Sequence, residues 1–213
     1  MNESKIKIKH FRTGPVSANT FIVYREGSDR GFVVDPGGNY KRICGEAAEL
    51  GVKLTAQLLT HGHFDHCGAS AALQRDGAAV YIHALDADKL STNGNLASLL
   101  GSGFERLTAD NLVRDGELIN LAGIDIRVMH TPGHSSGSCC FILEQPRIIF
   151  SGDTLFNMCV GRTDFPDGSA RELSRSLNEK LFALDGDYTV YPGHDEFTTL
   201  DYERLYNPEI EYD

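Results

Sequence analysis

Basic residues are scarce in this sequence and are not gathered into a patch. The 213 residues include 20 Lys and Arg against 30 Asp and Glu, which gives a formal net charge of −10 at pH 7. The longest basic run is Lys41–Arg42. Proteins that bind nucleic acid generally present a basic stripe to the phosphates. The composition therefore argues against a nucleic-acid partner.

Long apolar runs are also missing. A membrane-spanning helix needs about 20 consecutive apolar residues, whereas the apolar runs here, such as the one that follows Arg147, have the length of strands. The N-terminal sequence MNESKIKIKHF alternates charged residues with isoleucine and has no apolar core of signal-peptide length. We therefore expect a soluble, cytoplasmic protein that does not bind membranes.

CxxC spacing is absent as well. The cysteines are odd in number: Cys44, Cys67, Cys139, Cys140 and Cys159. The adjacent pair Cys139–Cys140 is expected to point to opposite faces of a strand. No disulfide framework is expected, and reduced thiols agree with a cytosolic compartment.

The sequence contains no internal repeat, low-complexity tract or linker, and 41% of its residues are apolar. This length suits one packed domain and is short for two, so residues 1–213 are predicted to form a single domain. Apolar periodicity and turn residues predict strands at 6–11, 19–26, 31–38, 55–60, 78–83, 116–123, 124–131, 138–144, 147–153 and 187–194. Helices are predicted at 39–50, 66–76, from Ala84, at 170–184 and at 198–206, with a surface excursion over 92–110. This order predicts a layered α/β sandwich.

The segment LLTHGHFDHCG (58–68) places His61, His63, Asp65 and His66 within six positions, directly after a predicted strand. His61 and His63 can point the same way and share one ion, whereas Asp65 and His66 aim at a neighbouring position. Imidazole with carboxylate suits Zn²⁺, Fe or Mn better than Ca²⁺ or Mg²⁺. The pattern therefore predicts a metal site rather than a polar loop in which Asp65 caps the next helix.

Three further candidate ligands follow predicted strands, each beside a glycine that lets the backbone turn sharply. His134 lies in TPGHSSG, Asp153 in FSGDTLF and His194 in YPGH. With the histidine cluster they make five histidines and two aspartates. This number is enough for two metals about 3.5–4 Å apart, bridged by one carboxylate and one hydroxide. The sequence thus predicts a two-metal hydrolase site.

The other three histidines and one aspartate are candidates for structural or supporting roles. His10 is expected to be structural, and His130, beside the TPGH motif, to orient that loop. His83 ends a strand and is either structural or a partner of a ligand histidine. Asp35, in GFVVDPGG, could hydrogen-bond a ligand histidine and fix its tautomer or could cap the DPGG turn.

The ordered motifs HGHFDH, TPGH, SGD and YPGH resemble the metallo-β-lactamase superfamily over nearly the whole chain, and NTFIVY and VDPGG match its first motif. The resemblance implies a four-layer αββα sandwich with two divalent metal ions, zinc foremost and iron or manganese as alternatives, at one edge of two facing sheets. It also implies the ligands: His61, His63 and His134 for the first metal, Asp65, His66 and His194 for the second, and Asp153 as the bridge.

Two further segments resemble one branch of that superfamily. GDTLFNMCVGRTDFPDGS (152–169) and PGHDEFTTLDYERLYNP (192–208) are similar to short bacterial hydroxyacylglutathione hydrolases of the glyoxalase II type. Asp153 stands where some true β-lactamases place a cysteine ligand, which argues against antibiotic hydrolysis. Full-length glyoxalase II enzymes carry a helical C-terminal domain with basic residues for glutathione. Because this sequence ends at Asp213, that domain is not expected here.

The resemblance implies that the chain is an enzyme. The expected reaction is hydrolysis of a small-molecule thioester, S-lactoylglutathione or a related hydroxyacyl thioester, by a metal-bridging hydroxide. Asp65 is the expected catalytic residue, since it could orient the hydroxide and handle its proton. Arg162 could bind substrate carboxylates or could only pair with Asp164.

Two other functions stay open. The first is a mononuclear iron dioxygenase that acts on glutathione persulfide, with His61, His134 and Asp153 as the ligands. The second is a non-catalytic member of the superfamily that binds a metal or a partner, although such a protein has little need of all seven ligands.

Overall fold

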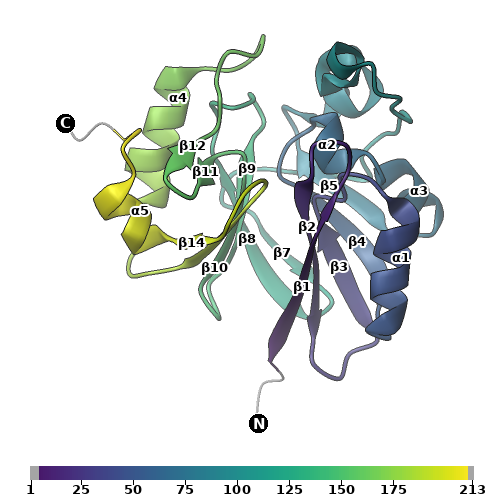
Figure 1. The fold of residues 1–213 in the computed structure, drawn as a ribbon. Helices are drawn as coiled ribbons and strands as arrows, with labels where there is room; N and C mark the ends of the chain where they lie inside the picture. Colours follow the sequence, from purple (N-terminus) through teal and green to yellow (C-terminus); the bar gives the residue numbers. More distant parts are fainter. Residues whose placement is uncertain (1–4, 211–213) are drawn as a thin grey trace.

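Strands with apolar residues on both faces form the centre of the fold. The computed structural model describes residues 5–210, and within them two six-stranded sheets face each other (Figure 1). Across the first sheet lie β1 (Ile6–Thr13), β2 (Ala18–Arg25), β3 (Arg30–Val34), β4 (Lys53–Leu59), β5 (Ala79–His83) and β6 (Asn111–Val113). Across the second lie β14 (Thr198–Thr199), β13 (Thr189–Pro192), β10 (Ile148–Gly152), β9 (Cys139–Leu143), β8 (Ile124–His130) and β7 (Leu118–Leu121).

Helices cover the outer face of each sheet (Figure 1). Beside the first sheet lie α1 (Tyr40–Glu49), α2 (Phe64–Cys67) and α3 (Ser70–Arg75), followed by 3₁₀ turns at Ala87–Ser91, Asn93–Asn95 and Ala97–Leu100. Beside the second lie α4 (Ala170–Arg175), which continues as a π-helical turn over Ser176–Leu181, and α5 (Leu200–Tyr206). A small hairpin, β11 (Leu155–Phe156) and β12 (Cys159–Val160), stands apart from both sheets.

Side chains that point alternately to the two faces of a strand explain the layers of the fold. In β2, Phe21 and Val23 belong to the core between the two sheets, whereas Ile22 between them packs toward α1 and α3. In β9, Cys139 faces the other sheet and Cys140 faces α4. Successive side chains of a strand point to opposite faces, so one strand supplies two cores. The predicted αββα sandwich and the predicted orientation of the two cysteines are both confirmed.

Several predicted elements differ from the observed ones. The predicted helix over 66–76 is broken because the amide of Ala69 donates to the carbonyl of Pro36 (2.9 Å) instead of to its own helix. The helix expected from Ala84 begins at Ala87 and is a 3₁₀ turn. The α-helix expected over 170–184 turns π-helical after Arg175. Thr198 and Thr199 pair with β13 before α5 begins, and the strands β6, β11 and β12 were not predicted.

The strand order brings distant loops to one edge. β3, β4 and β5 are parallel neighbours, and so are β10 and β13. The carboxyl ends of parallel strands lie at the same edge, where ligands commonly bind in open α/β sheets. The amide of Gly193 donates to the carbonyl of Gly152 (2.8 Å), which ties two of these strand ends together.

Two further findings concern membrane-spanning helices and disulfide bonds. None of the helices within residues 5–210 has both the length and the apolar character that crossing a membrane requires. All five cysteines are free, and Cys67, Cys139 and Cys140 are buried.

The core between the sheets gives a first prediction. Phe150 is fully buried, and its ring centroid lies 5.2 Å from that of Phe21 on the opposite sheet. Phe150→Ala should lower the free energy of unfolding of the metal-free protein by about 3–5 kcal/mol, measured by urea denaturation, because it leaves a cavity. Leu118→Ala, at a side chain that is 71% exposed, should change it by less than about 0.5 kcal/mol. Equal effects of the two substitutions would contradict this assignment of the core.

Candidate metal centre

All seven predicted ligands come together at the edge where the strands end. His61 and His63 follow β4, and Asp65 and His66 lie in α2. The other three follow β8, β10 and β13: His134, Asp153 and His194. Among the described residues, possible ligand atoms gather within 4.8 Å of one another in three overlapping groups: His61, His63 and His134; His61, His66 and Asp153; Asp65, His66 and His194.

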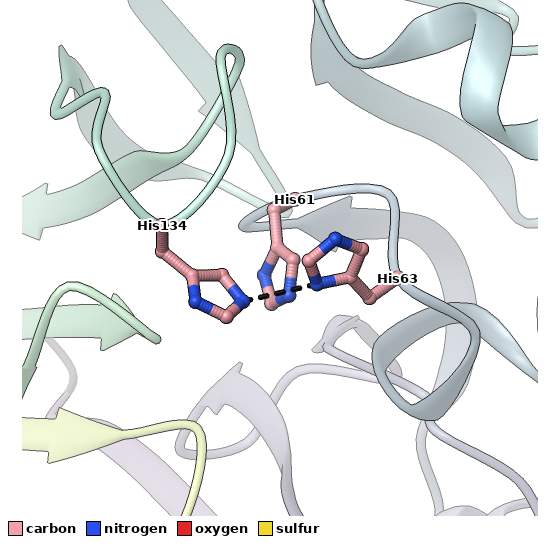
Figure 2. Close-up of side chains that lie close together, drawn as sticks. All are labelled: His61, His63 and His134. Atoms are coloured by element: carbon pink, nitrogen blue, oxygen red, sulfur yellow. Dashed lines mark hydrogen bonds between the residues drawn. The ribbon is translucent and has the colours of Figure 1, made fainter. Parts of the chain in front are cut away.

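The first group consists of three imidazoles that face one another (Figure 2). His63 Nδ1 lies 3.0 Å from His134 Nε2. The ring of His61 stands nearly perpendicular to both, with centroid distances of 4.6 Å to His63 and 4.9 Å to His134. This geometry matches the set expected for a first metal.

The second group adjoins the first through Asp153. Asp65 Oδ2 lies 3.2 Å from His194 Nε2 and 3.5 Å from His66 Nε2. The two carboxylate oxygens of Asp153 divide between the groups, since Oδ1 lies 3.3 Å from His66 Nε2 and Oδ2 lies 3.4 Å from His134 Nε2. Asp153 therefore stands where a carboxylate bridging two ions would stand.

Hydrogen bonds behind the rings fix their tautomers. His66 Nδ1 donates to Asp35 Oδ2 (3.0 Å), and His134 Nδ1 donates to the backbone carbonyl of Arg162 (2.8 Å). In the neutral form of each ring, which is the form that binds a metal, Nδ1 carries the proton and Nε2 is free to coordinate. The sequence left open whether Asp35 contacts a ligand histidine or caps the DPGG turn, and the structure shows the contact with His66.

Thr60 holds the third ring and was missed by the sequence reasoning. Its hydroxyl donates to Asp35 Oδ2 (2.7 Å) and so can accept from His61 Nδ1 (3.1 Å). Its amide donates to Asp35 Oδ1 (2.8 Å). One buried carboxylate thus orients two histidines, and a threonine beside a histidine gives no sequence signal of this role.

Asp86 was also missed, although it connects two of the ligand loops. Its fully buried carboxylate accepts from the amide of Gly62 (2.8 Å), between the first two ligands, and from Ser135 Oγ (2.8 Å) and the amide of Gly137 (2.7 Å), just after His134. Lys89 Nζ lies 2.5 Å from the same carboxylate. Asp86 therefore fixes the distance between the loop after β4 and the loop after β8.

Two of the glycines before the ligands turn the chain, and the third makes room. Gly133 and Gly152 have φ of +144° and +50°, which L side chains rarely adopt. Gly193 has no positive φ, but a Cβ there would lie 2.4 Å from Asp153 Oδ1 and 2.6 Å from His66 Cε1. The expectation of a sharp turn is thus met at Gly133 and Gly152, whereas Gly193 allows close packing against two ligands.

Unsatisfied buried atoms show that the site fits metal ions. Within residues 5–210, Nε2 of His61, His63 and His66 and Oδ1 of Asp153 are buried without a hydrogen-bond partner. Such groups lose their hydration and cost free energy unless something replaces it. Imidazole nitrogens and carboxylate oxygens converging on one point are the donor set of Zn, Fe or Mn.

The pKa shifts of the candidate ligands also favour metal binding. Burial, together with neighbouring histidines, holds the pKa of His61 and of His63 well below the usual value, so both lone pairs stay free. Burial alone would lower the pKa of His66, but three neighbouring carboxylates raise it well above its usual value. Burial would raise the pKa of Asp65, yet His66 and His194 keep it well below its usual value. The carboxylate of Asp65 therefore stays ionised and attracts positive charge.

The remaining histidines lie outside these three groups. His10 Nε2 is hydrogen-bonded with Asn19 Oδ1 (2.8 Å). His83 stacks on His130, with centroids 4.0 Å apart, and His130 Nε2 donates to the carbonyl of Ser136 (2.9 Å), two residues after His134. His130 thus holds the TPGH loop as predicted, and His83 contacts His130 rather than one of the seven predicted ligands.

A cavity of about 620 Å³ opens onto the centre. Five predicted ligands line it: His63, Asp65, His134, Asp153 and His194. Its other walls are mostly apolar: Val16, Phe64, Leu96, Leu99, Phe156, Val160 and Phe165. Leu96 and Leu99 come from the excursion over 92–110, which therefore forms part of the site and not only of the surface.

Sequence comparisons agree with the geometry. A family model described as the Metallo-beta-lactamase superfamily matches residues 13–194. Hydroxyacylglutathione hydrolase GloC of Haemophilus influenzae is 33% identical over 83% of this chain and 85% of its own length. The probable metallo-hydrolase YqgX of Bacillus subtilis is 35% identical over 95% of this chain and 97% of its own length.

Solved structures of similar proteins have the same fold. The BLEG-1 B3 metallo-beta-lactamase superposes with a TM-score of 0.90 at 31% identity, covering 95% of this chain and 98% of its own. The di-iron-bound form of TTHA1623 superposes with a TM-score of 0.84 at 32% identity, covering 94% of this chain and 98% of its own. ETHE1 from Myxococcus xanthus gives 0.80 at 29% identity, covering 95% and 83%.

The contact between Asp35 and His66 gives a second prediction. Asp35→Asn should weaken metal binding about 10–100-fold, because the amide cannot support the imidazole tautomer as the carboxylate does. The measurement is competition with a chromophoric chelator. Asp125→Asn, at an exposed aspartate of β8, should leave the metal affinity unchanged. An unaltered affinity in Asp35→Asn would show that the hydrogen bond does not support the site.

The buried carboxylate of Asp86 gives a third prediction. Asp86→Ala should lower the free energy of unfolding of the metal-free protein by about 3 kcal/mol, because it leaves three donors unpaired and removes a partner of the buried Lys89. Urea denaturation measures this. Asp88→Ala, at an exposed residue of the same turn, is the matched control. The prediction is wrong if the two variants are equally stable.

Proposed function

This chain belongs to the metallo-beta-lactamase superfamily, and we propose that its reaction is the metal-dependent hydrolysis of a thioester, with S-lactoylglutathione or a related hydroxyacyl thioester as the substrate. The observation that carries the proposal is the set of seven candidate ligands, five of them buried and several with unpartnered buried atoms, beside a cavity that five of them line. The likeness to a relative named hydroxyacylglutathione hydrolase supports the choice of substrate class.

The chain's own residues have distinct tasks in this reaction. His61, His63 and His134 would hold one cation, and Asp65, His66 and His194 a second, with Asp153 between them. Bound cations would lower the pKa of water toward neutrality and polarise the acyl carbonyl. Asp65, which His66 and His194 keep ionised, can orient the attacking water and accept its proton at Oδ2. The apolar walls formed by Phe156 and Phe165 exclude bulk water from the carbonyl.

A second candidate function is oxidation of glutathione persulfide at a single iron. The likeness to TTHA1623, which was solved in a di-iron-bound form, supports iron as the metal, and ETHE1 shares the fold. Two histidines and a carboxylate suited to one iron are present, since His134 Nε2 lies 3.4 Å from Asp153 Oδ2 and the ring of His61 lies beside that of His134.

The fourth prediction tests both functions together. The purified protein should hydrolyse S-lactoylglutathione, lose this activity on treatment with a chelator and regain it when a divalent metal is restored. His61→Ala should reduce kcat/KM more than about 100-fold, since loss of a ligand should exceed the 10–100-fold effect of losing a residue that supports one. His10→Ala, which removes a histidine outside the ligand groups, should retain most of the activity.

The same preparation is analysed for metal content and offered a β-lactam and, with oxygen, glutathione persulfide. Thioester hydrolysis that survives complete metal removal would contradict the hydrolase proposal. One iron per chain, oxygen uptake with the persulfide and no thioester hydrolysis would favour the second candidate. Cleavage of the β-lactam in preference to every thioester would assign the chain the reaction named for BLEG-1.

A further inference from the structure

A second cavity adjoins the one above the metal centre. It has a volume of about 770 Å³ and shares Val160 and Arg162 with the first cavity. One wall is α4 with the π-helical turn that follows it, and the opposite wall is the segment from β12 to Thr163, with Glu209 and Ile210 at one end. We call this cavity the α4 groove. Val160 and Arg162 therefore form the border between the two cavities.

The charge of the α4 groove is opposite to that of the protein. Three arginines line it, Arg162, Arg171 and Arg175, against the single carboxylate of Glu209, in a chain of net charge −10. Glu209 is directed to the hairpin, where its Oε2 accepts from the amide of Val160 (3.1 Å). The groove thus concentrates positive charge beside the site, as clefts that bind anions do.

Among the residues that the structure describes, none of the three guanidinium groups is paired with a buried carboxylate, and that of Arg162 also lies over the ring of Phe165 (4.5 Å to the centroid). Arg162 pairs with Asp164 (2.6 Å) and Arg175 with Glu179 (3.3 Å), but all four side chains are more than 60% exposed. Exposed pairs of this kind contribute about 0–1 kcal/mol, so a ligand can replace them at little cost. Within residues 5–210, the guanidinium of Arg171, a residue of α4, has neither a hydrogen bond nor an ion pair. Guanidinium groups recognise carboxylates and phosphates through paired N–H donors.

We propose that the α4 groove binds the anionic arm of the thiol carrier, with Arg171 and Arg175 as the residues that select for it. This inference rests on the proposed thioester hydrolysis and narrows its substrate class. The acyl group and the scissile carbonyl occupy the apolar cavity above the metal centre. The thiol part passes Val160 and Arg162 and places its carboxylates or phosphates beside α4. A thioester of a neutral thiol lacks these contacts.

The fifth prediction uses the double variant Arg171→Gln/Arg175→Gln. Glutamine keeps the aliphatic stem and the helix propensity while it removes both charges. The KM for S-lactoylglutathione should rise about 10-fold or more, because hydrogen bonds to charged groups are lost. The value of kcat should stay unchanged, since neither arginine touches the reacting carbonyl. The KM for a neutral thioester of N-acetylcysteamine should not change, and the difference between variant and wild type should shrink as salt is added.

The matched control is Arg30→Gln/Arg114→Gln, which removes the same two charges from positions outside both cavities. It should leave both KM values unchanged. An equal rise of KM in the control would assign the effect to overall charge. The same lactoyl group carried by coenzyme A distinguishes phosphates from carboxylates as the anionic source. The carrier whose thioester shows a higher KM in the double variant than in the wild type supplies the anionic groups that the α4 groove binds.

A binding measurement separates this proposal from the proposed function. Glutathione and coenzyme A are titrated by calorimetry into the metal-depleted protein, where no turnover occurs. Binding that is lost in the double variant and kept in the control supports the α4 groove even if no thioester is hydrolysed. Thioester hydrolysis with unchanged KM in the double variant overturns the α4 groove and leaves the hydrolase proposal intact. Absence of both hydrolysis and thiol binding overturns both proposals.

Discussion

The structure depends on the convergence of imidazoles and carboxylates at one edge of the two sheets. Imidazoles and carboxylates from five segments of the chain meet within a few ångströms, and several of the Nε2 atoms lack a partner in the described chain. The outward nitrogens of His61, His66 and His134 are already used in hydrogen bonds to Thr60, Asp35 and the backbone of Arg162. The rings therefore cannot turn to satisfy themselves, and positive charge at the centre is what relieves the site. The fold holds the donors in place for a cation instead of letting the cation collect them.

Two buried carboxylates make this rigidity possible, and the sheet determines where they stand. Asp35 follows β3 and Asp86 follows β5, on either side of β4, whose end carries the first two histidines. Because the three strands are parallel neighbours, their carboxyl ends lie side by side. Asp35 supports the histidines from one side, while Asp86 joins their loop to the loop of His134 on the other sheet. The strand order, which serves the hydrophobic core, thereby also sets the spacing of the ligands.

Local patterns could predict the ligands and suggest Asp35 and His130 as supports, but they gave no sign of Thr60 or Asp86. His134, Asp153 and His194 were predictable because each directly follows a recognisable strand, and strand ends of one edge must meet. The partner of His66 could not be identified from the sequence, because Asp35 lies 31 residues away and also belongs to a turn motif. Thr60 and Asp86 are ordinary polar residues near strand ends, and only their side-chain directions distinguish them. The break after α2 escaped prediction for the same reason, since it results from a tertiary hydrogen bond to Pro36.

The two parts of the site differ in how strongly the fold constrains them. The metal ligands lie within four residues of a strand end or in the short helix that follows one, so a change there disturbs the sheet edge itself. The walls that meet the rest of a substrate come from the 3₁₀ turns around Leu96 and Leu99, from the hairpin before Val160 and from the exposed face of α4. These segments pair with neither large sheet, and their side chains can be exchanged without loss of a core contact between the sheets. In the proposed reaction, chemistry and substrate choice therefore reside in separate structural layers, and a protein of net charge −10 can present a groove lined by arginines beside its metal centre without altering that centre.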